Sequence, residues 1–272
     1  MSLSSRLPRL WLLLCFAVAW PTHSLAAADP STIPTASLRD SLARALGVSG
    51  AQVVEAQGYG LRTANGIGGV VLGRYHESSG RYTFPVLAVY HDCPGGTCQT
   101  LLRLGQAVDR IAPIALVDLD TPVADVPRLQ PILPRMAVPQ PEKPPRYPVL
   151  LIGGEPQQRE PSSPAAQTRH SEQHLIIVSL QSATAPTQLH SLTLSERWAE
   201  PADAQIRPPR RVGHQIEGIL LGRSGAEQVL IIRERDIDSR YSRGLRPAPR
   251  ERRFRLVAGR FVAQPEHGSP ID

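Results

Sequence analysis

The sequence predicts a small α+β domain, with one helix and about five mostly antiparallel strands, followed by an all-β domain that is a sandwich or a meander. A helix-type apolar pattern occurs once, near the N-terminus, whereas strand-type patterns fill most of the remaining chain. A proline-rich stretch divides these strands into two groups. The predicted divisions are a signal peptide (1–28), a disordered segment (29–36), the α+β domain (37–120), a linker (121–148), the all-β domain (149–264) and a tail (265–272).

The first 28 residues have the pattern of a secretory signal peptide. Arg6 and Arg9 precede an apolar run of about eleven residues, which is shorter than the roughly 20 residues that span a bilayer. Ala26-Ala27-Ala28 then fits the small-residue pattern of a cleavage site. We therefore expect a periplasmic or secreted protein with no integral membrane segment after cleavage, and with Cys93 and Cys98 as its remaining cysteines.

The predicted helix covers the segment SLRDSLARALG, residues 37–47. Leu38, Leu42 and Leu46 recur every four residues, the spacing of a helix that packs along one side. Ser37 is the candidate N-cap, and Gly47 is a natural end because glycine adopts the left-handed conformation readily.

Strands are predicted after the helix because short apolar segments rich in β-branched residues follow one another. In order, they are AQVVEAQ, GIGGVVLGRYH, YTFPVLAVYHD, QTLLRLG and APIALVDLD. The third and fourth are separated by a turn-forming sequence between Cys93 and Cys98. An exported chain meets oxidising conditions, so we expect these cysteines to form a disulfide that closes a hairpin. A thioredoxin-type centre would need a C-x-x-C spacing, and a metal site beside His91 would need more ligands.

The stretch from Thr121 to Pro148 contains nine prolines. Prolines do not donate backbone hydrogen bonds and favour an extended conformation, so we expect a semi-rigid spacer. The alternative is a docking segment for a partner that recognises proline-rich chains.

Six further strand-type segments predict the second domain. They are YPVLLIGG, HLIIVSLQ, QLHSLTLSERW, VGHQIEGILLGR, EQVLIIRERDI and RRFRLVAGRFV. GVVLGR in the first half resembles GILLGR in the second, which fits either a duplication or two hairpins with the same local requirements.

Common catalytic motifs are absent: the chain has no G-x-S-x-G, S-x-x-K, H-E-x-x-H or P-loop sequence. We therefore predict no catalytic residues and no cofactor. One weak metal-ligand candidate remains in RHSEQH, where His170, Glu172 and His174 would share a face of a regular strand. The alternative to a metal site is a polar segment that leads into the next strand.

Arginines are concentrated in the C-terminal quarter. Fourteen arginines and six acidic residues lie between Arg207 and Arg260. The candidate contact residues for an anionic surface are Arg240, Arg243, Arg246, Arg250, Arg252 and Arg253. Their alternative role is that of solvated side chains whose stems cover apolar neighbours. Nucleic acid is an unsuitable partner, since the protein is predicted to be exported and only Tyr241 and Phe254 lie among these arginines.

These observations favour an exported, non-catalytic binding or assembly protein of the cell envelope. Its partner would be an envelope protein or an anionic envelope polymer, bound by the arginine-rich strands. An exported metal-dependent hydrolase that uses His170, Glu172 and His174 is the alternative. A third hypothesis is a chaperone-like or inhibitory module that pairs through an exposed sheet edge.

Overall fold

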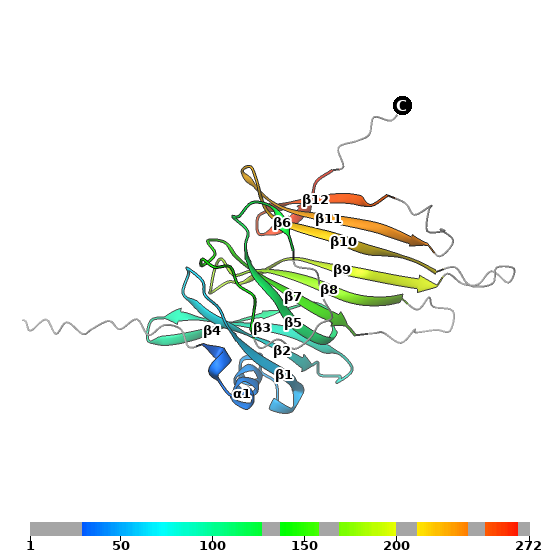
Figure 1. The fold of residues 1–272 in the computed structure, drawn as a ribbon. Coiled ribbons are helices and arrows are strands. Elements are labelled where there is room, and N and C mark those ends of the chain that lie inside the picture. The colour runs from blue at the N-terminus through cyan, green and yellow to red at the C-terminus, as the bar shows by residue number, and fades with distance from the viewer. Residues whose placement is uncertain (1–28, 127–136, 158–168, 200–210, 239–247, 266–272) are drawn as a thin grey trace, which may run out of the picture.

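The computed structural model describes residues 29–126, 137–157, 169–199, 211–238 and 248–265, and gives only the backbone for 169–172, 196–199 and 211. This part of the chain is mostly β-structure, with one α-helix near the N-terminus and antiparallel sheets (Figure 1). The predicted helix and the predominance of antiparallel strands are confirmed. The predicted signal peptide (1–28) and residues 266–272 of the tail lie outside the described residues.

Helix α1 (Thr35–Leu46) begins two residues before the predicted cap, because Pro34 and not Ser37 occupies the N-cap position. The Pro34 carbonyl accepts the first helical hydrogen bond, from the Leu38 N–H at 3.1 Å. Gly47 ends the helix in the left-handed conformation, with φ of 72°. Of the helices that the structure describes, none has both the length and the apolar character needed to cross a membrane.

Residues 29–36, predicted to be disordered, instead form a short 3-10 helix, η1 (Pro30–Thr32), and the start of α1. The Asp29 carboxylate caps η1 by accepting a hydrogen bond from the Ser31 N–H at 2.8 Å. Pro30 is buried, and it packs where Gly58 and Gly69 leave no side chain in the way. Composition alone did not reveal this contact, because the glycines that receive Pro30 lie some thirty to forty residues further along the chain.

The first sheet is a four-stranded antiparallel meander beneath which α1 lies (Figure 1). A second 3-10 helix, η2 (Gly50–Gln52), leads into it. The strands of this first sheet, in spatial and sequence order, are β1 (Val53–Gly60), β2 (Ile67–His76), β3 (Thr83–Cys93) and β4 (Gly96–Arg103). Alternation divides the side chains between its two faces: Val71, Val86 and Ala88 pack with α1, whereas Leu72 and Leu87 belong to the apolar cluster on the other side.

The second sheet contains all the other strands that the structure describes, and eight of them form a continuous antiparallel path. In spatial order these are β13 (Arg260–Ala263), β12 (Arg250–Val257), β11 (Glu227–Asp238), β10 (Arg211–Ser224), β9 (Thr187–Ala199), β8 (Arg169–Ser179), β7 (Pro148–Pro156) and β5 (Val108–Asp118). The short strand β6 (Ala124–Asp125) pairs with β10 beside this path. The similar segments GVVLGR and GILLGR lie in β2 and β10, each of which pairs with the strand that follows it.

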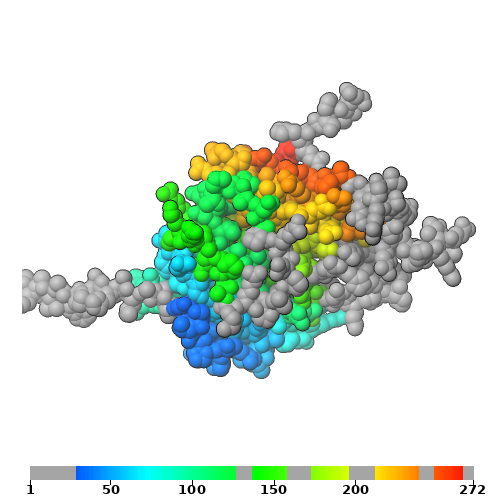
Figure 2. Space-filling model, viewed as in Figure 1, coloured from blue at the N-terminus to red at the C-terminus, as the bar shows by residue number. Residues whose placement is uncertain are grey.

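One apolar cluster lies between the two sheets and draws on both halves of the sequence. It contains Leu72 and Leu87 of the first sheet together with Leu150, Ile152 and Ile176 of the second. The last strand predicted for the N-terminal domain, β5, pairs with β7, the first strand after the proline-rich stretch. The predicted two-domain layout is thus not confirmed, and Figure 2 shows the blue-to-cyan residues in direct contact with the green ones.

The described part of the proline-rich stretch packs against the sheets. Val138 is buried in the cluster between them, and the Pro139 carbonyl accepts a hydrogen bond from the Leu116 N–H at 2.8 Å. The Gln140 side chain accepts from the Arg62 N–H at 2.7 Å and donates to the Gly60 carbonyl at 3.0 Å. This glutamine therefore satisfies backbone groups of the first sheet that would otherwise need water.

The second sheet curls over its own inner face. β10 pairs with β9 only over residues 211–215, and beyond a register shift its Leu220 and Leu221 pair with β6 instead. The His190 ring of β9 lies 5.0 Å from the Phe254 ring of β12, measured between ring centroids. Because β10 and β11 separate β9 from β12 along the path, this contact requires strong curvature. The curl encloses a second large apolar cluster, which includes Leu151, Leu230 and Phe261.

Candidate functional site

The predicted disulfide is present at the β3–β4 hairpin. The Cys93 and Cys98 Cα atoms lie 5.8 Å apart, and Cys93 pairs in register with Gly96, so the cysteines are diagonal neighbours. His91 is buried, and its two ring nitrogens lie 3.1 Å from the Asp92 carbonyl and 3.1 Å from the Thr100 hydroxyl. Both of its nitrogens are thus engaged, and the hairpin has the features of a structural element.

Replacing both Cys93 and Cys98 by serine is expected to lower the free energy of unfolding by about 2 kcal/mol. The physical reason is the extra chain entropy that the unfolded state gains when a short loop opens. Urea denaturation of the double variant measures the loss, and reduced wild-type protein should reproduce it. Equal stability of the oxidised wild type and the double variant would contradict this assignment.

The candidate metal ligands His170, Glu172 and His174 lie in β8, whose register against β9 shifts between Ser171 and Gln173 and again before His174. The strict alternation that would place all three on one face is thus interrupted. The side chains of His170 and Glu172 lie outside the described residues. His174 is buried, and its Nδ1 is 3.1 Å from the Thr193 hydroxyl. Among the described side chains, no group of three histidine, cysteine or acidic residues is arranged to hold a metal ion.

Of the six candidate contact arginines, Arg240, Arg243 and Arg246 lie outside the described residues. The other three belong to β12, where most arginines pair with acidic residues of β11. Four ion pairs join the two strands: Arg233–Glu251, Arg250–Asp236, Arg252–Glu234 and Arg255–Glu227, with N···O distances of 3.2, 2.9, 3.5 and 3.2 Å. Exposed pairs of this kind contribute little stability, but they balance the charge locally. The described arginines therefore present less net positive charge than their number suggests.

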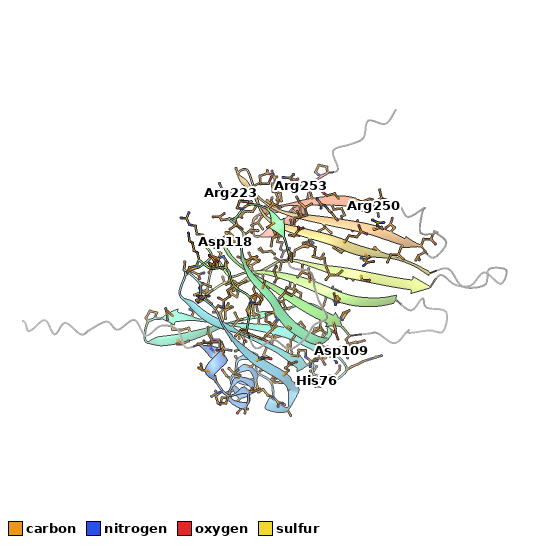
Figure 3. The ribbon with its side chains drawn as sticks, in the orientation of Figure 1. His76, Asp109, Asp118, Arg223, Arg250 and Arg253 are labelled. Atoms are coloured by element: carbon orange, nitrogen blue, oxygen red, sulfur yellow. A yellow bond between two sulfur atoms is a disulfide. The ribbon has the colours of Figure 1, made fainter. Side chains whose placement is uncertain are left out.

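Three described arginines of this region have no carboxylate partner among the described residues: Arg223, Arg253 and Arg260. The first two both contact the turn between β10 and β11, and Figure 3 labels them in this part of the molecule. Arg253 donates to the Ser224 hydroxyl at 3.1 Å, and the Nε of Arg223 donates to the Gly225 carbonyl at 2.9 Å. These neutral acceptors position both side chains, and neither guanidinium forms an ion pair with a carboxylate of the described residues.

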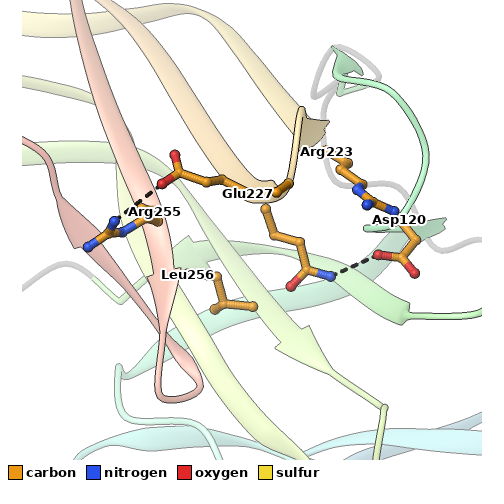
Figure 4. Close-up of a pocket in the computed structure, with 7 residues that line it drawn as sticks. Asp120, Arg223, Glu227, Arg255 and Leu256 are labelled. Atoms are coloured by element: carbon orange, nitrogen blue, oxygen red, sulfur yellow. Dashed lines mark hydrogen bonds and ion pairs between the residues drawn. The ribbon is translucent and has the colours of Figure 1, made fainter.

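A polar depression of about 370 Å³, which we call the turn pocket, lies beside these arginines (Figure 4). Asp120 accepts a hydrogen bond from the Gln228 amide at 3.1 Å, and Glu227 pairs with Arg255 across the opening. Leu256 provides an apolar side chain at its edge. The turn pocket thus contains two acidic and two basic side chains, of which Glu227 and Arg255 form an ion pair, and it is a mixed polar surface.

A second pocket, of about 330 Å³, lies on the inner face of the curled sheet between β9 and β12. We call it the inner-face pocket. Each of four strands contributes one polar and one apolar side chain two residues apart: His190 and Leu192, His214 and Ile216, Glu234 and Ile232, Arg252 and Phe254. This spacing puts both members of each couple on the same face of their strand. The pocket thus combines an apolar floor with a few convergent polar groups, a typical composition for a small-molecule site.

The protonation of His190 is set by its surroundings in this pocket. Burial, together with the nearby positive charge of Arg252, lowers the pKa of the His190 imidazole below its ordinary value of 6.5. The ring packs against Phe254 and Phe261, with centroid distances of 5.0 and 6.4 Å. These surroundings therefore favour the neutral form of the His190 ring.

The lowered pKa predicts a pH dependence of stability. The unfolded chain binds a proton at His190 more readily than the native state does, so stability falls as the pH decreases through about 6.5. A His190→Gln variant lacks this contribution and is expected to lose less stability between about pH 7.5 and about pH 5.5. Urea unfolding of both proteins at the two pH values measures the difference. An identical pH dependence would show that His190 titrates as it does in the unfolded chain.

Comparisons with protein-family models, with curated proteins and with solved structures give no match to this chain.

Proposed function

We propose that the protein is an exported, non-catalytic binding or assembly protein of the cell envelope that contacts an anionic partner through its C-terminal strands. The observation that carries this proposal is a group of three arginines that have no carboxylate partner within the described part of the chain: Arg223 and Arg253 at the β10–β11 turn, and Arg260 on β13. We call these three residues the open arginines. The disulfide at Cys93 and Cys98 supports an oxidising location, where such hairpin links persist.

The charge of the C-terminal strands gives the proposed surface its selectivity. Among the described residues, β10 to β13 and their flanks carry nine arginines and six acidic residues. Most of these acidic residues form ion pairs with arginines between β11 and β12. The open arginines are therefore available to bind an approaching polyanion. Their planar guanidinium groups bind phosphate and carboxylate groups well.

Retention on isolated cell-envelope fractions tests the proposal. The test variant replaces the open arginines with serine, and the matched control replaces Arg44, Arg62 and Arg81, three exposed arginines of the N-terminal half, with the same loss of charge. At low ionic strength the test variant is expected to bind at least about tenfold more weakly, because each arginine near an acidic surface contributes about 1 kcal/mol.

The control variant should bind like the wild type, and moderate salt should reduce wild-type retention. Equal retention of the test variant and the wild type would remove the open arginines from the function. Equal weakening of the test and control variants would show that net charge alone, without a particular surface, governs association.

A further inference from the structure

We propose that the inner-face pocket binds a small amphipathic carboxylate, with its apolar body on the pocket floor and its carboxylate on Arg252. This ligand is a separate one from the anionic envelope partner, since the pocket uses none of the open arginines. Three features of the pocket support this inference: the curvature of the sheet, the exposure of Arg252 and the position of the His190 ring.

The floor of the pocket comes from neighbouring strands held in register. Ile216 of β10 pairs with Glu234 of β11, and Ile232 of β11 pairs with Arg252 of β12. In each of the two strand pairs an apolar side chain therefore lies opposite a polar one. Leu192 on β9 and Phe254 on β12 close the sides of this floor, because the sheet curls. A volume of about 330 Å³ admits a short acyl chain or a single aromatic ring.

Arg252 is the charged group of the pocket that a ligand can reach. Its side chain is 49% exposed, whereas that of its partner Glu234 is only 13% exposed. One guanidinium nitrogen lies 3.5 Å from a Glu234 oxygen, a single long contact that leaves most of the five N–H donors available. The guanidinium carbon also lies over the Phe254 ring, 5.2 Å from its centroid, a contact that favours this position of the side chain.

This arrangement selects a carboxylate over a cation. A cation would have to approach the exposed guanidinium in order to reach the less exposed Glu234. A carboxylate can instead accept two parallel hydrogen bonds from the edge of Arg252 that faces away from Glu234. Repulsion by Glu234 restricts the carboxylate to that edge and so fixes its position.

His190 supplies a second polar contact. The structure records no hydrogen bond at either His190 ring nitrogen within the described residues, although the ring lines the pocket. In its neutral form one ring nitrogen donates and the other accepts. The donor can bind the second carboxylate oxygen or a neighbouring hydroxyl. His214 differs, since its Nε2 already lies 3.4 Å from the Thr193 carbonyl.

Three probes with the same six-carbon chain and different head groups test this proposal: hexanoate, 1-hexanol and hexylamine. Titration of the purified full-length protein, followed by amide chemical-shift changes, gives both affinity and location. Hexanoate is expected to bind roughly tenfold or more tightly than either other probe, the difference that hydrogen bonds to a charged group provide. The shift changes should centre on residues 190–193, 214–216, 232–234 and 252–254.

An Arg252→Gln variant is expected to lose this preference, whereas Arg110→Gln, which removes an arginine of β5 that is 67% exposed and does not line the pocket, should keep it. Thermal unfolding of both variants verifies that they fold. Equal affinity for hexanoate and 1-hexanol would show that the pocket binds only the apolar chain and would contradict a carboxylate site at Arg252. Higher affinity for hexylamine would show that Glu234, and not Arg252, determines the preferred head group. Absence of saturable binding, or shift changes elsewhere, would also overturn the proposal. Envelope retention is measured without these probes and with other arginines, so the two proposals fail independently.

Discussion

Replacing Leu150 by alanine is expected to lower the free energy of unfolding by about 2–5 kcal/mol, the range observed for truncation of a buried leucine. Leu150 is fully buried in the cluster between the two sheets, so its removal leaves a cavity that neither sheet can easily fill. Urea denaturation measures the loss. Val262→Ala is the matched control, since Val262 is 51% exposed and its truncation should change stability by less than about 0.5 kcal/mol.

The Leu150 variant also tests whether the sheets unfold together. If both depend on this cluster, amide probes in β2 and in β8 should show the same shifted unfolding midpoint. A shift confined to probes of the second sheet would contradict the shared core and would favour two independent domains.

Gly58→Ala is expected to be similarly damaging, with a loss of about 3 kcal/mol. A Cβ atom at this position would lie 2.0 Å from the carbonyl oxygen of Pro30, and a backbone atom cannot turn away as a flexible side chain can. The control is Gly105→Ala, because a Cβ at Gly105 would meet no atom within 4 Å. Urea denaturation of both variants measures the difference.

A deletion of residues 29–34 tests whether the loss of stability in Gly58→Ala comes from the contact with η1. If η1 is what the new methyl group displaces, Gly58→Ala should cost little further stability in the deleted chain, and the two changes should be strongly non-additive. Additive losses would show that the N-terminal residues do not pack at Gly58.

The strands could be predicted from the sequence because their signals are local. All eleven segments with alternating or continuous apolar residues overlap strands of the structure. The final segment, RRFRLVAGRFV, was predicted as one strand but forms two, β12 and β13. Ala258 and Gly259 adopt positive φ angles of 48° and 77° and reverse the chain between them. Glycine at the second position was the available signal for this turn.

The arrangement of the strands could not be predicted, because it depends on contacts distant in sequence. The chain passes from the first sheet to the second between β4 and β5, and β5 then pairs with β7, although nearly thirty residues separate these two strands. The two residues of β6 are too few to form a pattern, and they pair with Leu220 and Leu221 of β10, beyond the residues at which β10 pairs with β9. Composition likewise indicated a spacer in a stretch whose Val138 and Gln140 pack against the sheets.

The inner-face pocket was missed for the same reason. Each strand carries a recognisable couple, such as His190 and Leu192 or Arg252 and Phe254, with one polar and one apolar residue at the spacing of a single strand face. Nothing local shows that these couples converge, since convergence requires the curl that brings β9 near β12. The arginine count of the same region was visible, but the ion pairs between β11 and β12 were not.

Hydrogen–deuterium exchange of the full protein, with and without cell-envelope fractions, tests most directly whether the C-terminal strands are the contact surface. We expect slower exchange on binding in residues 218–228 and 248–263, which carry the open arginines, and unchanged exchange in β1 to β4. Protection of α1 or of the β3–β4 hairpin, with β10 to β13 unaffected, would contradict the proposed surface.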